Sequence, residues 1–131
     1  MSTANYNALA GVPLTRGRVV PDGTSVGAGA TVTADVLVQG ADELVVEADM
    51  NGAVSGDLIP TVVPYEFDNV TLSPNISLTA MASSGPTFGG GKIGYFGRFD
   101  VTAFEKVQVQ LKNNNAGAQN MNRASWRVQG T

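Results

Sequence analysis

The chain has 131 residues, no cysteine and a charged fraction of 15%, which is the size of one compact domain with no covalent cross-links. Its net charge of −3 and pI near 4.7 argue against nucleic-acid binding, because such modules concentrate Lys and Arg on one face or in a tail. No apolar run approaches the ~20 residues that span a bilayer, and no charged and apolar signal segment opens the chain. We therefore expect no nucleic-acid or membrane partner, and synthesis in a cytoplasm.

Sixteen glycines and six prolines stand among Val, Leu, Thr, Ser and Asn. This mixture favours strands and turns over helices. In segment 85–91, Pro86 removes a backbone donor and the glycines add to the entropy of the unfolded chain. The composition predicts an all-β fold.

Residues 1–18 show neither a helical nor a strand period, and we interpret them as an extended N-terminal arm before a β-sandwich domain at 19–131. An arm buries its backbone only on a partner. Its larger and charged side chains are the predicted partner-binding residues: Tyr6, Leu9, Val12, Leu14, Arg16 and Arg18. The alternative is a disordered, tag-like terminus.

From Val19 onward, strand-like runs alternate with turn residues at short spacing, as in sandwiches and barrels. The clearest strand is 105–112, where Val107, Val109 and Leu111 alternate with polar residues. Similar inward rows are Leu44, Val46 and Ala48; Ile76, Leu78 and Ala80; and Ala124, Trp126 and Val128. We predict a single β-sandwich of about eight strands, jelly-roll or immunoglobulin-like.

The chain also resembles itself after a shift of 63 residues, the separation of Leu44 from Val107. The same shift places Val38 on Val101, and Val63 on Trp126. Two equivalent hairpins facing each other across a sandwich would give this pattern. Chance similarity between amphipathic strands is the alternative.

Candidate chemistry is sparse, because the chain has no histidine and no cysteine. That removes the commonest general base, the thiol nucleophile and the usual zinc ligands. Carboxylates could act in a pair on a glycosidic bond; they are Asp42, Glu43, Glu47, Asp49, Asp57, Glu66, Asp68, Asp100 and Glu105. Several lie on the polar side of a predicted strand, so we expect no enzyme, no catalytic residues and no cofactor.

Two motifs resemble ligand loops. Gly89 to Gly94 matches G-x-G-x-x-G, but residues 93–101 read as a strand where a dinucleotide site needs a helix. Residues 49–57 offer side-chain oxygens for calcium, although Asn51-Gly52 is first of all a hairpin turn. We predict a surface loop for the first and no metal site for the second.

The stretch 97–128 has the form of a strand, an Asp-Val-Thr turn, an alternating strand, an Asn-rich loop and an Ala-Ser-Trp strand. With the arm, it resembles small phage virion proteins of the head decoration (cement) type. The resemblance implies a structural subunit, often trimeric, on the outer surface of the phage head. Its partners would be the major capsid protein and copies of itself.

Two other classes remain open. A carbohydrate- or receptor-binding sandwich of a tail appendage would need several exposed aromatics or a calcium loop. The aromatic Trp126 lies in an inward row and is expected in the core. An enzyme would need carboxylates that converge in a pocket.

Overall fold

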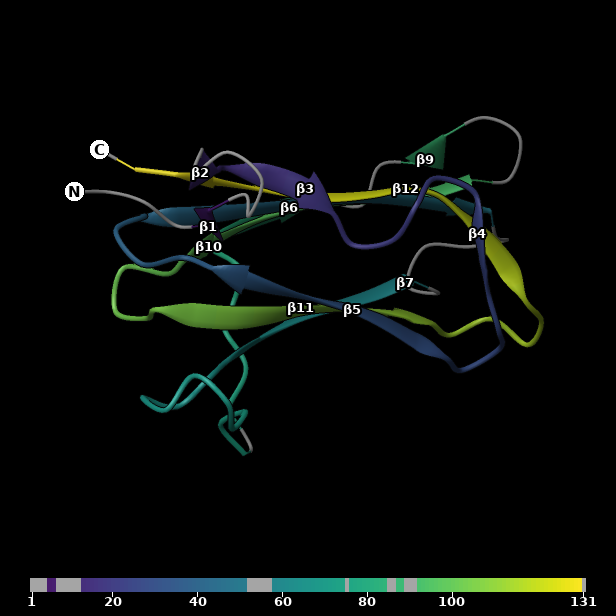
Figure 1. Ribbon diagram of the computed structural model, residues 1–131. Coiled ribbons are helices and arrows are strands. Elements are labelled where there is room, and N and C mark those ends of the chain that lie inside the picture. Colours follow the sequence, from purple (N-terminus) through teal and green to yellow (C-terminus); the bar gives the residue numbers. More distant parts are fainter. Residues whose placement is uncertain are drawn as a thin grey trace.

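The computed structural model describes residues 5–6, 13–51, 58–74, 76–84, 87–88 and 92–130, and within these ranges it is all-β, without a helix. Two sheets pack face to face (Figure 1). The large sheet contains β3 (Arg16–Arg18), β4 (Thr24–Val26), β6 (Glu43–Asn51), β8 (Ala82–Ser84), β9 (Thr87–Phe88), β10 (Lys92–Asp100) and β12 (Gln119–Gln129). The small sheet contains β5 (Thr31–Leu37), β7 (Leu58–Pro64) and β11 (Lys106–Asn113).

The strand order identifies a jelly-roll sandwich. The large sheet runs β3-β12-β6-β10-β8, with β4 following β3 along the edge of β12 and β9 lying beside β10; the small sheet runs β5-β11-β7. First strands therefore pair with last strands in a nested series: β3 and β4 with β12, β5 with β11, and β6 with β10. This nesting is the jelly-roll arrangement, and it confirms the predicted all-β sandwich.

The last nested pair is missing, because β8 lies beside β10 and not beside β7. The segment after β7 instead folds back along the free edge of that strand. The Ser73 N–H donates to the Pro64 carbonyl (2.9 Å) and the Leu78 N–H to the Val62 carbonyl (2.8 Å). These bonds satisfy edge groups that would otherwise invite pairing with another chain.

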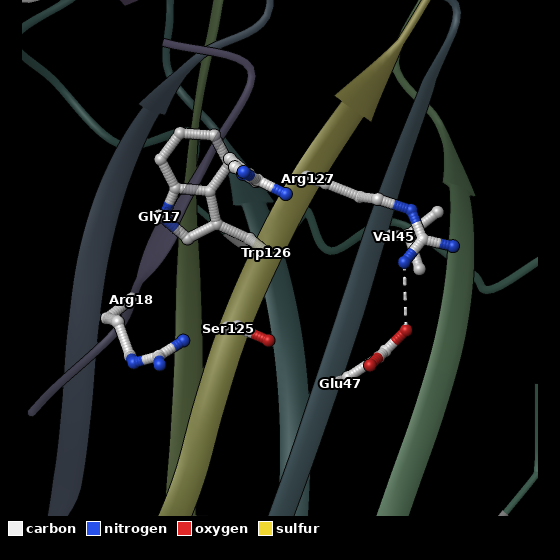
Figure 2. Close-up of a pocket in the computed structure, with 8 residues that line it drawn as sticks. Gly17, Arg18, Val45, Glu47, Ser125, Trp126 and Arg127 are labelled. Atoms are coloured by element: carbon white, nitrogen blue, oxygen red, sulfur yellow. Dashed lines mark hydrogen bonds and ion pairs between the residues drawn. The ribbon is translucent and has the colours of Figure 1, made fainter. Parts of the chain in front are cut away.

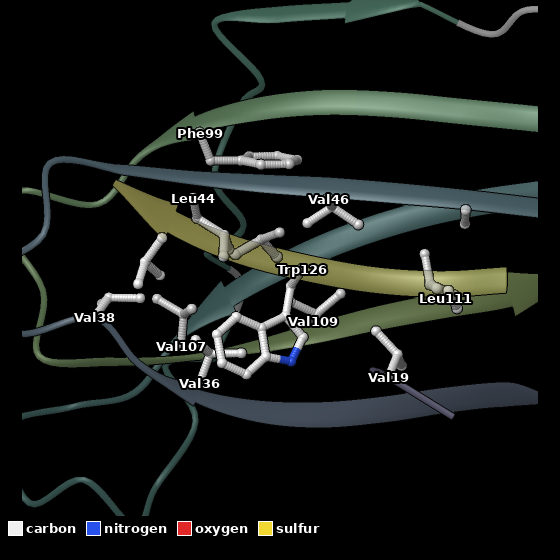
Figure 3. Close-up of a cluster of buried hydrophobic side chains, with 14 of the residues drawn as sticks. Val19, Val36, Val38, Leu44, Val46, Phe99, Val107, Val109, Leu111 and Trp126 are labelled. Carbon is white, nitrogen blue, oxygen red and sulfur yellow. The ribbon is translucent and has the colours of Figure 1, made fainter. Parts of the chain in front are cut away.

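The core lies between the sheets and is built from alternating inward residues (Figure 3). All three inward rows predicted on β6, β11 and β12 are buried, and Trp126 retains only 7% exposure. The predicted row at 76–80 is wrong in part: Leu78 and Ala80 pack against the core, but Ile76 is 53% exposed. This segment is no strand and bonds only one edge of β7, so no period of two forces Ile76 inward.

Among the side chains that the structure describes, one polar residue, Asn113, is fully buried. Its Nδ2 donates to the carbonyls of Val26 (2.9 Å), Gly27 (3.3 Å) and Gly117 (3.0 Å), and its Oδ1 accepts from the Asn115 N–H (2.9 Å). One side chain thus ties the end of β11 to two loops. A buried amide with these partners is satisfied and fixes the loop positions.

The internal repeat is structural. The shift of 63 residues turns the pair Leu37–Lys106 between β5 and β11 into the pair Asp100–Glu43 between β10 and β6. The linking loops obey the same relation: the Val38 N–H donates to the Glu105 carbonyl (2.8 Å), and the Val101 N–H donates to the Asp42 carbonyl (3.0 Å). Strands β5, β6 and β7 therefore correspond to β10, β11 and β12.

The predicted reading of this repeat as two facing hairpins is wrong. Strands β6 and β7 lie in different sheets, and so do β11 and β12. Each repeat crosses from one sheet to the other, and the strands pair between repeats, β6 with β12 and β7 with β11. The repeat therefore relates one sheet to the other.

A β-bulge breaks the correspondence at one place. Met121 pairs with Met50, as the repeat requires, but Arg123 then pairs with Asp49, which leaves Asn122 as an extra residue in β12. In a regular strand, residues three positions apart face opposite sides of the sheet. The extra residue lets Met121 and Ala124, which are three positions apart, both face the core, and both are buried.

The boundary between arm and sandwich lies earlier than predicted. Strand β3 pairs with β12, and the Val128 N–H donates to the Thr15 carbonyl (2.7 Å). The sandwich therefore begins near Thr15 and not at Val19, because residues 15–18 already form hydrogen bonds with the edge of β12. Before it, β1 (Asn5–Tyr6) pairs with β2 (Pro13–Leu14).

Candidate partner-binding surfaces

The predicted arm residues fall into three groups. Tyr6 lies in β1 and Leu14 in β2, and these two strands pair with each other. Leu9 and Val12 lie outside the described residues. Arg16 and Arg18 are exposed residues of β3. The structure brings these two arginines together on the outer face of the large sheet, and their partner-binding role stays a prediction.

A hollow of about 350 Å³ lies beside the two arginines (Figure 2). Arg127, Glu47 and Val45 also line it. Within it Arg127 pairs with Glu47 (2.9 Å), and at its border Arg18 pairs with Asp22 (2.9 Å). Two of its three arginines are thus neutralised within the chain, which lowers the attraction of the hollow for an anion.

The carboxylates of β6 form a ladder of ion pairs across this face. Arg98 donates two hydrogen bonds of 2.7 Å to Glu43, and Arg123 lies 3.8 Å from Asp49. The hydrogen bond from Arg98 lowers the pKa of Glu43. A general acid needs the opposite shift, a raised pKa. The Glu43 carboxylate is thus held as an anion by Arg98 of the neighbouring strand.

In the candidate calcium loop 49–57, the side-chain oxygens that the structure describes already have partners within the chain. Asp49 faces Arg123, and the Asn51 Oδ1 accepts from the Asn122 Nδ2 (3.0 Å). Residues 52–57 lie outside the described part. No group of three or more acidic side chains able to hold a metal occurs among the residues described.

Glycines 89–91 likewise lie outside the described residues. The strand predicted at 93–101 is confirmed as β10, which runs over Lys92–Asp100. A strand after the glycines leaves no helix N-terminus to receive a phosphate.

The most distinctive surface is the segment 65–74, here named the projection. It follows β7 and extends below the small sheet, away from the large one (teal in Figure 1). At its tip Phe67 is 98% exposed and Val70 is 78% exposed. Single exposed apolar residues are common, but a phenyl ring with almost no contact to its own chain is unusual.

Hydrogen bonds fix the shape of the projection. The Glu66 N–H donates to the Thr71 carbonyl (2.8 Å), which closes the loop. Inside it Asp68 accepts from the N–H groups of Thr71 and Val70 (both 2.9 Å) and from the Thr71 hydroxyl (2.7 Å). These bonds, led by the one from the Thr71 N–H, lower the pKa of Asp68. Asn69 adopts a positive φ of 57°, which asparagine tolerates in turns.

Further bonds tie the projection to the sandwich, at its base through Tyr65 and near its tip through Asn69. The Tyr65 hydroxyl donates to Asp35 (2.6 Å), which contributes most to raising the pKa of Tyr65 to about 12. The Lys106 ammonium donates to the Asn69 carbonyl (3.0 Å) and lies 4.5 Å from the centre of the Tyr65 ring. The Asn69 amide donates to Glu105 (3.1 Å). The projection is therefore held at its base and near its tip.

A second hollow, of about 440 Å³, separates the projection from the turn before β11. Tyr65, Phe67, Ala103 and Phe104 give it an apolar lining. Phe104 is half-buried and packs against the core, so the core holds this side of the hollow in place. The hollow and the tip together form one partly apolar surface at one end of the sandwich.

Sequence reasoning missed Phe67 as a candidate. Aromatic side chains are expected in the core, and Trp126 and Phe99 are buried there. The available signal was its position directly before Asp68-Asn69, a turn pair. An aromatic residue next to such a pair falls at a loop tip, where the core does not reach.

No protein-family model matches this chain, and no curated protein sequence matches it. Across the described residues there is no helix long and apolar enough to cross a membrane.

Proposed function

We propose that the chain is a structural virion protein, a decoration or cement subunit that stabilises a phage head by binding neighbouring capsid subunits. The observation that carries the proposal is the projection, a hydrogen-bonded loop that presents Phe67 and Val70 to the surroundings. Aromatic anchors on rigid loops are typical of protein interfaces. A jelly-roll sandwich whose large sheet carries paired charges on its outer face suits a subunit that packs and does not catalyse.

The mechanism would be stabilisation by mass action. A subunit that binds only the assembled shell shifts the equilibrium toward that shell. Contacts with the major capsid protein would come from the projection and from the arm residues before β3, and contacts with other copies would produce a trimer. None of these steps requires a cofactor.

The test is co-sedimentation of the full-length protein with empty heads of the source phage, with light scattering to give its mass in solution. We expect saturable binding to expanded heads, weaker binding to unexpanded heads, and a solution mass of three times the 13.5 kDa chain. Failure to bind expanded heads would overturn the proposal. Binding to glycans in place of heads would favour the alternative of a tail appendage module.

A further inference from the structure

We infer that the projection is the docking element, and that its partner is a protein surface with an apolar pocket bordered by Lys or Arg. This inference deepens the proposed function and rests on it. Phe67 would be the anchor, with Val70 beside it. Capsid contact would then depend on an ordered loop of the sandwich, in addition to any contribution from the arm.

Order in the free protein is the first argument. The tip is closed by the bond between Glu66 and Thr71 and braced internally by Asp68. A loop that is already ordered loses little conformational freedom on binding, so more of the contact energy appears as affinity. Phe67 is also presented by a backbone whose direction is set, which favours a single register on the partner.

Charge is the second argument, and it identifies the kind of partner. Three exposed carboxylates surround the tip and the adjoining hollow: Glu66, Asp68 and Glu105. The nearby cation, Lys106, is turned toward Asp35 (3.9 Å) and the Asn69 carbonyl. The surface around Phe67 is thus acidic, and its complement is basic.

The same charges argue against two other occupants. A second copy in a two-fold contact would bring Glu66 and Asp68 against their own equivalents, and such like charges repel. The contacts of the proposed trimer are heterologous, and the oligomer mass of Phe67→Ser tests those separately. A membrane with anionic headgroups would be repelled as well. A basic protein surface is the occupant that both the phenyl ring and its acidic border fit.

The experiment uses the full-length protein and empty heads of the source phage. Phe67→Ser removes the anchor, and Ile59→Ser is its control, since Ile59 is 39% exposed at the opposite end of β7. Glu66→Gln removes one charge near the tip, and its control, Asp49→Asn, removes one charge that pairs with Arg123 on the outer face of the large sheet. Phe67, Ile59 and Glu66 are exposed, and Asp49→Asn keeps the size of the side chain. All four variants should therefore fold, which thermal unfolding verifies.

We expect Phe67→Ser to weaken head binding about tenfold or more. Glu66→Gln should weaken binding at low salt and have less effect as salt rises, because screening removes the charge contribution. Both controls should bind as the wild type does. Equal binding by wild type and Phe67→Ser would overturn this inference and leave the proposed function standing, whereas failure of the wild type to bind would overturn the proposed function itself.

Two parallel measurements separate the other occupants. Loss of the oligomer mass in Phe67→Ser would assign the projection to contacts between copies and overturn the inferred partner. Binding of the wild type to phosphatidylglycerol-containing vesicles, lost in Phe67→Ser, would assign it to a membrane with the same consequence. An unchanged mass and no vesicle binding support the basic protein partner.

Discussion

At the scale of single residues, close contacts explain positions that composition cannot. Gly17 lies opposite Trp126 in the sheet, and a Cβ built on it would lie 2.8 Å from Cζ2 of the indole. The glycine lets the ring cover the edge strand. Because the contact is with a core side chain that is 7% exposed, the ring has little room to move away.

Gly17→Ala should therefore destabilise the sandwich by about 1–3 kcal/mol, the usual cost of overpacking. The control is Gly117→Ala, since a Cβ at Gly117 meets no heavy atom within 4 Å. Urea unfolding measures both free energies. Equal stability of the two variants would show that the indole yields without cost.

Asn113 gives a second prediction, which depends on pH. In Asn113→Asp a carboxylate oxygen replaces the donor that faces the carbonyls of Val26 and Gly117, which should cost about 3 kcal/mol at neutral pH. Burial among acceptors raises the pKa of the new carboxyl above its unfolded value, so the lost stability should return as the pH falls and the group can donate again. The control is Asn114→Asp, at an exposed position. Urea titrations at neutral and acidic pH should show neither the loss of stability at neutral pH nor its return at acidic pH for this variant.

At the scale of elements, periodicity predicted most strands and failed where the chain departs from strict alternation. Strands β6 and β11 carry a regular period of two, and their predicted inward residues are buried. Strand β12 begins at Gln119, but the bulge at Asn122 shifts the phase, so only the part from Arg123 was visible in the sequence. The exposed tip at Phe67 could not be predicted from period at all, because the projection is held by side-chain bonds of Asp68.

Deleting Asn122 tests what the bulge does. Without it, Met121 and Ala124 are two positions apart and both still face inward, opposite Met50 and Ala48, because side chains alternate along a strand. We therefore expect the deletion to keep the near-ultraviolet circular dichroism of Trp126 and a cooperative unfolding transition, and to cost about 1 kcal/mol from the lost hydrogen bond between Asn122 and Asn51. Asn122→Ala keeps the extra residue and loses the same hydrogen bond to Asn51, so it should also cost about 1 kcal/mol. Loss of the cooperative transition in the deletion variant alone would show that the sandwich needs the bulge itself.

The projection offers a prediction about proton binding. Thr71→Val removes the hydroxyl that donates to Asp68 and keeps the backbone bonds, so the pKa of Asp68 should rise but stay below its usual value. The pKa of Asp68 is lower in the folded loop than in the unfolded chain, so its carboxylate stabilises the loop when the pH is above the unfolded-state pKa. This stabilisation is lost as the pH falls through the folded-state pKa. Carboxyl-carbon NMR titration gives the midpoint, with Asp100 as an internal reference. An unchanged midpoint for Asp68 would contradict the role of the hydroxyl.

At the scale of the whole molecule, the repeat accounts for the jelly-roll shape. Two copies of a strand-loop-strand-loop-strand unit pair with each other, so each sheet receives strands from both copies. The sequence showed this relation as a shift of 63 residues, but not that each copy crosses between sheets. That step depends on the loop bonds between Val38 and Glu105 and between Val101 and Asp42, which join distant backbone groups.

The placement of β3 decides how the arm can be tested. A chain of residues 19–131 lacks Thr15 and the three residues that pair with β12, and so exposes the edge of that strand and the indole of Trp126. A chain of residues 15–131 retains them. We expect the longer form to be more stable by roughly 3 kcal/mol in urea unfolding, from the restored hydrogen bonds and the covered ring. Equal stabilities would place the start of the sandwich at Val19. If the difference is observed, weak head binding by the 19–131 form reflects a damaged sandwich, and only the 15–131 form isolates the contribution of residues 1–14.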